Sequence, residues 1–276
     1  MTGRARLNGA GMRQPKGSGM GDERGTALVT GGGKRIGASI VRHLAEAGYR
    51  VVIHYAQAAH EARALQTALS DEGHAVFLAK ADLADEEAVG RLLDVARQEA
   101  GPIDLLVNNA SVFLPDRADH HDPEIWQTHF AVNLQAPCRL AADLYAQTDV
   151  DAQKSRAIIN LLDQRVLHPN PLYFSYTLSK SALWTATKTM AQSFAPHVRV
   201  NGVGPGPTLP NNQEGIAGLA HERAGVLLEK GPEPSDIAEA VLYLAQARLV
   251  TGQMLAVDGG QHLGWKTPDI MLQEQA

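Results

Sequence analysis

Short apolar runs alternate with helical apolar patterns along most of the chain. The run at residues 26–30 leads through consecutive glycines into apolar positions spaced three and four residues apart, from Ile36 to Ala47. This order predicts a strand, a tight loop and a helix that ends at Gly48. Similar apolar runs predict further strands at 51–53, 75–78, 103–107, 157–161, 198–203 and 254–257. Helical patterns predict a helix around Leu65 and Leu69 up to Gly73, and further helices at 85–100, 124–147, 176–194 and 235–247.

The alternation of strands and helices indicates the class of fold. Parallel strands need crossover connections, so alternating elements with short connections predict a parallel sheet covered by helices on both faces. We therefore expect an α/β protein with a doubly wound sheet, whose ligand lies outside the carboxyl ends of the strands. No repeat or linker interrupts residues 26–260, and we expect a single domain over residues 25–264.

The N-terminal residues differ from the rest of the chain. They are rich in glycine and basic residues, contain no acidic residue before Asp22 and show no apolar periodicity. A disordered arm is therefore expected at residues 1–24. The segment also lacks the apolar centre of a secretory signal.

Composition and charge narrow the functional classes. The 276 residues carry a formal net charge of -5, so no basic field is available to gather nucleic-acid phosphates. No apolar run approaches the roughly 20 residues that span a bilayer, and we expect no membrane partner. The single cysteine, Cys138, excludes an intrachain disulfide and a cysteine zinc site. It favours a reducing compartment, and we expect a cytoplasmic protein.

A glycine-rich turn lies between the first predicted strand and helix. Residues 30–37 read Thr-Gly-Gly-Gly-Lys-Arg-Ile-Gly, where glycines let backbone amides approach a pyrophosphate and the helix N-terminus favours its charge. The common G-x-G-x-x-G pattern fails, because Ile36 stands where its third glycine falls. Tight turns need glycine without any ligand, so this turn alone is weak support for nucleotide binding.

Later motifs strengthen the nucleotide-binding interpretation, because they follow one another in a specific order. They are Thr30-Gly31 with Gly37, Ala81-Asp82-Leu83, Asn108-Asn109-Ala110, Asn133, Tyr176 with Lys180, and Pro205-Gly206. Together they resemble the short-chain dehydrogenase/reductase family over nearly all of residues 26–263. The resemblance implies a Rossmann-type fold and hydride transfer with a nicotinamide cofactor.

Several residues depart from the general family pattern. Arg35 stands at the usual middle glycine, Ser111 at another usual glycine and Asp163 at the usual catalytic serine. With Phe113, these departures are similar to pteridine reductases and to the dihydromonapterin and dihydrofolate reductases of the same superfamily. The resemblance implies that Phe113 stacks on a pterin ring, with core packing as the alternative. Arg35 offers a rigid fork to phosphate and pterin oxygens, with surface solvation as the alternative.

Tyr176 and Lys180 are the expected centre of the chemistry. A free tyrosine has a pKa of about 10, so a proton-donating phenol needs a nearby cation, and Lys180 lies one helical turn away. We expect its ammonium to lower the pKa of the phenol, and the resemblance implies that it also binds the nicotinamide ribose. An exposed Tyr-Lys pair on an amphipathic helix is the alternative.

Asp163 is the most informative residue for the substrate class. A carboxylate would repel the alkoxide that forms from a ketone, whereas it can help to protonate a ring nitrogen of a dihydropterin, directly or through water. An aspartate that caps the next segment is the alternative. By resemblance, Asn133 lies at a backbone irregularity that holds a water linked to Lys180, and a bond to nearby backbone is its alternative.

The choice of cofactor is predicted from the end of the second strand. No carboxylate follows this strand before Glu61, which favours NADPH over NADH. Lys34, Arg35 and His54 are expected to surround the extra phosphate, while Gln57 and Ala58 replace the Arg and Ser typical of pteridine reductases. The expected cofactor-binding residues are Gly31, Lys34, Arg35, Ile36, His54, Asp82, Leu83, Asn109, Ala110, Tyr176, Lys180, Pro205 and Gly206. The expected substrate-binding residues are Arg35, Ser111, Phe113, Asp163 and Tyr176, and the expected catalytic residues are Asp163, Tyr176, Lys180 and Asn133.

The histidines invite a metal-site hypothesis. The group at His120, His121 and His129 lacks a spacing such as H-E-x-x-H, so we expect no metal and place these residues in solvated loops. By resemblance, residues 208–231 form a substrate lid. The resemblance also implies a homotetramer, with the tail at 265–276 crossing a subunit interface.

The hypothesis that unites these residues is an NADPH-dependent reductase of a small molecule, a dihydropterin of the dihydrobiopterin, dihydromonapterin or dihydrofolate type. A short-chain reductase of another carbonyl or imine is the alternative, because the fold does not determine the substrate. A third candidate is a non-catalytic nucleotide-binding module. The Tyr176-Lys180 pair argues against it, since binding alone needs no tuned phenol.

Overall fold

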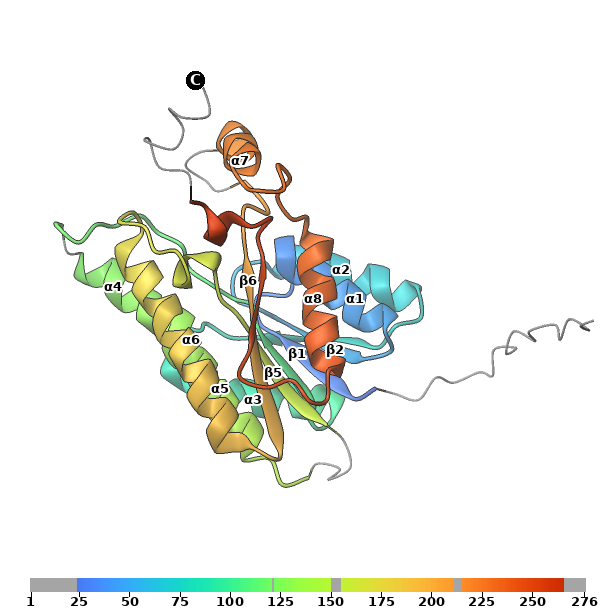
Figure 1. Ribbon diagram of the computed structural model, residues 1–276. Coiled ribbons are helices and arrows are strands. Elements are labelled where there is room, and N and C mark those ends of the chain that lie inside the picture. The colour runs from blue at the N-terminus through green and yellow to red at the C-terminus, as the bar shows by residue number, and fades with distance from the viewer. Residues whose placement is uncertain (1–23, 121, 150–154, 211–214, 266–276) are drawn as a thin grey trace, which may run out of the picture.

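The fold is built on one parallel sheet. The computed structural model describes residues 24–120, 122–149, 155–210 and 215–265. The described strands form a seven-stranded sheet in the order β3-β2-β1-β4-β5-β6-β7, and every pairing is parallel (Figure 1). Their bounds are β1 Thr26–Val29, β2 Arg50–Tyr55, β3 Val76–Lys80, β4 Leu105–Asn108, β5 Arg156–Leu161, β6 Val198–Pro205 and β7 Met254–Val257. The predicted doubly wound α/β architecture is confirmed.

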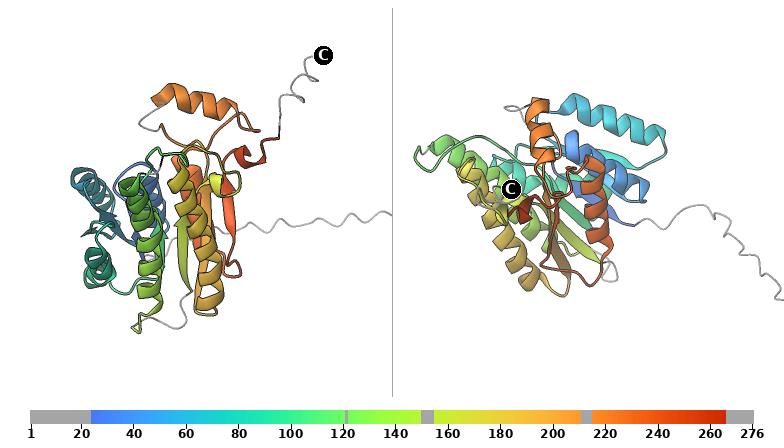
Figure 2. Two further views of the ribbon diagram at one scale, coloured as in Figure 1. Left: turned by 90° about the vertical axis from the view of Figure 1, so that its left-hand side faces the viewer. Right: turned by 45° about the horizontal axis from the view of Figure 1, so that its top comes forward.

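Helices cover both faces of the sheet (Figures 1 and 2). One face packs against α1 (Arg35–Glu46), α2 (Ala59–Asp71) and α8 (Pro234–Gln246). The other packs against α3 (Glu86–Ala100), α5 (Ala136–Tyr145) and α6 (Phe174–Phe194). Because both faces are covered, the strands are apolar almost throughout rather than alternating, which made them easy to recognise in the sequence.

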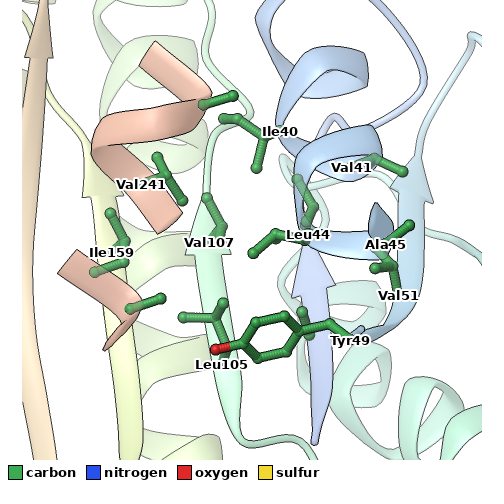
Figure 3. Close-up of a cluster of buried hydrophobic side chains, with 14 of the residues drawn as sticks. Ile40, Val41, Leu44, Ala45, Tyr49, Val51, Leu105, Val107, Ile159 and Val241 are labelled. Atoms are coloured by element: carbon green, nitrogen blue, oxygen red, sulfur yellow. The ribbon is translucent and has the colours of Figure 1, made fainter. Parts of the chain in front are cut away.

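The first core layer shows how the helices meet the sheet. Ile40 and Leu44 of α1 and Val241 of α8 point toward Val107 of β4 and Ile159 of β5 (Figure 3). Each of these five side chains is at most 1% exposed. Burying a side chain of this size contributes about 1.5–3 kcal/mol, so this layer rigidly fixes the strand ends that carry the site.

The ends of the predicted helices and strands lie within two residues of the observed ends. Two regions differ in the type of structure that they form. The predicted helix at 124–147 is divided into α4 (Pro123–Phe130), a π-helical turn η1 (Ala131–Gln135) and α5. A π-turn inserts one extra residue into the helical ladder, which the apolar spacing does not reveal, although the family resemblance places a backbone irregularity at Asn133. The predicted lid region contains a further helix, α7 (Gly215–Ala224).

Several predictions are not decided by this structure. The predicted arm at 1–24 and tail at 265–276 lie almost entirely outside the described residues. Among the residues that are described, no helix has the length and apolarity that crossing a membrane requires.

Candidate functional site

Two adjoining cavities open at the carboxyl edge of the sheet. The first has a volume of about 510 Å³ and lies beside the ends of β1 and β2. The second, of about 250 Å³, lies beside the ends of β5 and β6, and Arg35 and Ser111 line both cavities. Strand order reverses between β1 and β4, which is where doubly wound sheets bind their ligands.

The glycine-rich turn forms the floor of the first cavity. Gly31 has a positive φ of 61°, and a Cβ on Gly37 would overlap the carbonyl oxygen of Gly31. The Asn109 side-chain amide donates to the carbonyl oxygens of Thr30 and Gly31, at 2.8 and 3.1 Å. Only a residue without a Cβ fits at Gly37, so the turn has the close-packed shape expected of a phosphate-binding loop.

His54 holds this turn through hydrogen bonds at both of its ring nitrogens. Its Nδ1 accepts a hydrogen bond from the Gly31 amide at 3.0 Å, and its Nε2 is bonded to the Ala81 carbonyl at 3.1 Å. Burial lowers the pKa of His54 to about 4. His54 lines the first cavity, so its place at the cofactor site stays a prediction. Both ring nitrogens are already hydrogen-bonded and the pKa is lowered, so the ring contributes by holding the turn and not by charge.

The other predicted cofactor residues line one or the other cavity. The end of β2 contributes Tyr55, Ala56, Gln57 and Ala58 to the first cavity, with no acidic side chain among them. Asp82 also lines this cavity, and its Oδ1 accepts from the Ala84 amide at 3.0 Å. The remaining predicted residues of the first cavity are Gly31, Lys34, Arg35, Ile36, Leu83, Asn109 and Ala110, and those of the second are Tyr176, Lys180, Pro205 and Gly206.

The second cavity brings the two predicted proton-handling residues together. The Tyr176 hydroxyl donates a hydrogen bond to Oδ2 of Asp163 at 2.9 Å. Oδ1 of Asp163 accepts from the Arg165 amide at 2.8 Å, so Asp163 also caps the short turn η2 (Gln164–Val166). The capping alternative and the contact with Tyr176 are thus both realised, each by a different carboxylate oxygen.

The electrostatics of Tyr176 differ from the expectation. Burial, and then the Asp163 carboxylate, raise the pKa of Tyr176 well above its usual range, while the Arg165 guanidinium opposes the rise. The Lys180 ammonium donates to the Leu161 carbonyl at 2.7 Å and lies 5.8 Å from the centre of the Tyr176 ring. The prediction that Lys180 lowers the pKa of the phenol is therefore wrong in this arrangement. Burial lowers the pKa of Lys180 itself to about 8.

Arg165 is a site residue that the sequence interpretation missed. Its Nη1 lies 3.2 Å from Oδ2 of Asp163, the oxygen that Tyr176 also contacts. The guanidinium carbon lies 5.4 Å from the centre of the Phe113 ring and 5.6 Å from that of Tyr173. A basic residue two positions after a strand-end aspartate was the available signal.

Phe113 forms an aromatic wall of the second cavity. Its ring stacks on Tyr173 with centres 4.0 Å apart and meets Tyr176 edge-on at 4.7 Å. The cavity-lining and packing alternatives therefore coexist, since Tyr173 covers part of the ring while Phe113 still lines the cavity. Such aromatic pairs contribute about 0.5–1.5 kcal/mol beyond the area they bury.

Asn133 lies within the π-turn η1 and is fully buried. Its Oδ1 accepts from the Val112 amide at 2.8 Å and from the Ser111 hydroxyl at 3.1 Å. Its Nδ2 donates to the Val112 carbonyl at 3.0 Å and to the Ser179 hydroxyl at 3.2 Å. The expected backbone irregularity is present, and the alternative of bonding to nearby backbone also holds.

Arg35 and the histidines singled out in the sequence lie in the following positions. The Arg35 side chain donates to the Pro210 carbonyl at 3.0 Å, which joins the glycine-rich turn to the predicted lid. Glu222 of α7, in the same region, lines the second cavity.

The three histidines of the metal-site hypothesis differ in their surroundings. His120 is exposed as expected, and His121 lies outside the described residues. The assignment of His129 to a solvated loop is wrong, because His129 is 0% exposed. No group of three potential metal ligands occurs in the described part of the chain.

Comparisons with known proteins agree with this geometry. A family model described as enoyl-(acyl carrier protein) reductase matches residues 32–262. The chain is 35% identical over 249 residues to 3beta-hydroxysteroid dehydrogenase 1 of Eggerthella lenta, covering 86% of this chain and 94% of that protein. The crystal structure of FolM alternative dihydrofolate reductase 1 from Brucella suis with NADP is 43% identical, with a TM-score of 0.85, covering 89% of this chain and 98% of that one. A blue fluorescent protein from a metagenomic library, in complex with NADPH, is 31% identical with a TM-score of 0.77, covering 86% of this chain and 97% of that one.

Proposed function

Because the chain belongs to the short-chain dehydrogenase/reductase family, we propose that it is an NADPH-dependent reductase of a dihydropterin. The product is the corresponding tetrahydropterin. The observation that carries the proposal is the hydrogen bond between Tyr176 and Asp163 beside the aromatic wall of Phe113. The FolM structures from Brucella suis and Brucella canis, 43% and 42% identical, support the same substrate class.

The first cavity suits NADPH. The turn at Gly31 and Gly37 lies at the start of α1, where the helix N-terminus favours a pyrophosphate, and Lys34 and Arg35 line the cavity with positive charge. The end of β2 offers no carboxylate to repel a 2′-phosphate. When bound, NADPH supplies a hydride to the substrate carbon. Asn109, which lines both cavities, and Lys180, which lines the second, are assigned to hold and orient the nicotinamide half.

Tyr176 and Asp163 are assigned the delivery of the proton. The nitrogen of a ring C=N bond has a basic lone pair, which takes the proton of the Tyr176 hydroxyl, directly or through water, as the hydride adds to the neighbouring carbon, so no free nitrogen anion forms. The Arg165 guanidinium, which contacts the same carboxylate and opposes the rise of the Tyr176 pKa, is assigned to stabilise the phenolate that this leaves. Ser111, Arg35 and Phe113 line the same cavity and are assigned to binding the flat heterocycle.

A carbonyl reductase is the second candidate, because the chain is 35% identical to a hydroxysteroid dehydrogenase. Its substrate oxygen would become an alkoxide next to Asp163. In a partly buried site this repulsion is unfavourable, so Asp163 favours nitrogen chemistry. The expectations of a homotetramer and a cytoplasmic location rest on the resemblance and the single cysteine, and sedimentation would check the tetramer.

A substrate panel tests the proposed function. Loss of NADPH absorbance is followed with dihydrobiopterin, dihydromonapterin, dihydrofolate and simple ketones, using the Tyr176→Phe variant as the background control. We expect at least one dihydropterin to be reduced faster than every ketone. Turnover of ketones with no turnover of any dihydropterin would overturn the proposal.

A further inference from the structure

His129 of α4 connects the two walls of the second cavity. It is 0% exposed, and its Nε2 accepts a hydrogen bond from the Leu114 amide at 3.1 Å. Its Nδ1 lies 2.7 Å from the Ser175 hydroxyl. An amide N–H can only donate, so Nε2 carries the lone pair and the proton of the neutral ring is on Nδ1, which donates to Ser175.

The two partners of His129 are sequence neighbours of the site residues. Leu114 directly follows Phe113, and Ser175 directly precedes Tyr176. The imidazole ring also packs edge-on against Tyr176, with ring centres 5.9 Å apart. One side chain therefore holds the backbone next to Phe113 and the side chain next to Tyr176.

Asn133 makes a matching connection one turn further along the chain. It holds both the amide and the carbonyl of Val112, and it donates to Ser179, the neighbour of Lys180. Phe113 is thus held on one side by Asn133 and on the other by His129. The two side chains form successive links between the segment at 111–114 and helix α6.

We propose that His129 is a positioning residue of the reductase site, which sets the placement of Phe113 relative to the Tyr176 hydroxyl. The proposal rests on the proposed function, because it assigns these two side chains to substrate binding and proton delivery. A displacement of about 1 Å between reacting groups costs on the order of 100-fold in rate.

Simple packing would not explain the arrangement. An apolar ring at position 129 would fill the same space but leave the Leu114 amide and the Ser175 hydroxyl without these partners. Burial lowers the pKa of His129, with Lys180 acting in the same direction and Asp116 opposing it, which agrees with a neutral ring. The buried ring is therefore selected by its donor and acceptor pattern and not by its shape alone.

The tautomer gives a test that requires no substrate. In ¹⁵N-labelled protein at neutral pH, the ring nitrogens of His129, assigned by their loss in His129→Phe, are expected to show the Nδ1–H neutral form. His54, whose Nδ1 accepts from Gly31, is expected to show the opposite Nε2–H form and is an internal comparison. A charged ring or an Nε2–H form at His129 would overturn the proposed bonding.

Kinetics test the positioning itself. His129→Phe is expected to lower kcat/KM for the dihydropterin by about 10- to 100-fold, while the dissociation constant of NADPH, measured by fluorescence, changes less than about twofold. His129→Gln, which keeps an acceptor for Leu114, is expected to recover part of the loss. His197→Phe, at an exposed position after α6, is the matched control.

Two results would contradict the positioning role. One is an equal loss of NADPH affinity in His129→Phe, which would indicate general damage to the fold, and the other is unchanged kcat/KM. If the wild-type enzyme reduces a ketone and no dihydropterin, the proposed function fails, and the same comparison is made with the ketone. If no substrate of the panel is reduced, the tautomer still decides the proposed bonding.

Discussion

The hydroxyl of Tyr176 and Oδ2 of Asp163 lie 2.9 Å apart and share a hydrogen bond. Nη1 of Arg165 approaches the same carboxylate oxygen at 3.2 Å. When the phenol loses its proton, two negatively charged oxygens remain side by side. The cation at Arg165 stabilises that state, so in the proposed mechanism Tyr176, Asp163 and Arg165 act together as the proton donor.

Replacing Tyr176 by Phe tests the donor. The ring and its contact with Phe113 are kept while the hydroxyl is lost. We expect kcat for a dihydropterin to fall by about 10²- to 10⁴-fold, the usual contribution of a general acid. The KM for NADPH should hardly change. A kcat equal to that of the wild type would remove Tyr176 from the mechanism.

Replacing Arg165 by Gln tests the supporting charge. Without the guanidinium, the pKa of Tyr176 rises further, since Arg165 is the cation that opposes the rise. We expect kcat for a dihydropterin to fall by about tenfold, equivalent to ~1.4 kcal/mol. Arg165→Lys keeps the charge and should recover part of the loss. Identical kcat values in the two variants would show that the charge does not matter.

The buried His54 predicts an acid-labile fold. Its pKa falls from the ordinary 6.5 to about 4 on folding, so the unfolded chain binds more protons between these values. The free energy of unfolding should decrease as the pH falls from about 6.5 to about 4, by about 3 kcal/mol, and this contribution levels off below that range. His129, with a pKa lowered in the same direction, adds to the trend.

Urea unfolding at several pH values measures the contribution of His54. The His54→Asn variant lacks the titrating ring, so its free energy of unfolding should depend less steeply on pH than that of the wild type. Parallel pH dependences for the two proteins would rule out the assigned role.

Replacing Lys34 by Ala tests the preference for NADPH. Lys34 lines the first cavity beside Arg35, at the start of α1. Losing one cation near a 2′-phosphate should raise the KM for NADPH by about tenfold, or ~1.4 kcal/mol, and leave that for NADH nearly unchanged. Lys188→Ala, which alters a lysine that packs on Trp184 and does not line this cavity, is the control. Equal changes for both cofactors would place the extra phosphate elsewhere.

The fold was largely predictable from the sequence because its signals are local. A parallel sheet buried on both faces leaves continuous apolar runs such as that of β5, and helices such as α1 show a regular apolar spacing. The π-turn at Asn133 was not predictable from periodicity, since one inserted residue hardly changes an apolar pattern.

The site was predictable only where residue types are distinctive. Asp163, Tyr176 and Phe113 come together as expected. The roles of His54 and His129 depend on partners that are 15 to 46 residues away in the chain. Nothing in the local sequence distinguishes a buried histidine that accepts from a backbone amide from an exposed one. The placement of His129 in a solvated loop was therefore wrong, and the bonding of His54 to the glycine-rich turn was not foreseen.

The central claim is that Asp163 makes this site a reductase of C=N bonds, and the most direct measurement is the rate of NADPH oxidation by the wild type and by Asp163→Ser with a dihydropterin and with a ketone. The account predicts that the serine variant loses about 100-fold or more with the dihydropterin, while its rate with the ketone is kept or increased. An unchanged dihydropterin rate in Asp163→Ser would contradict it.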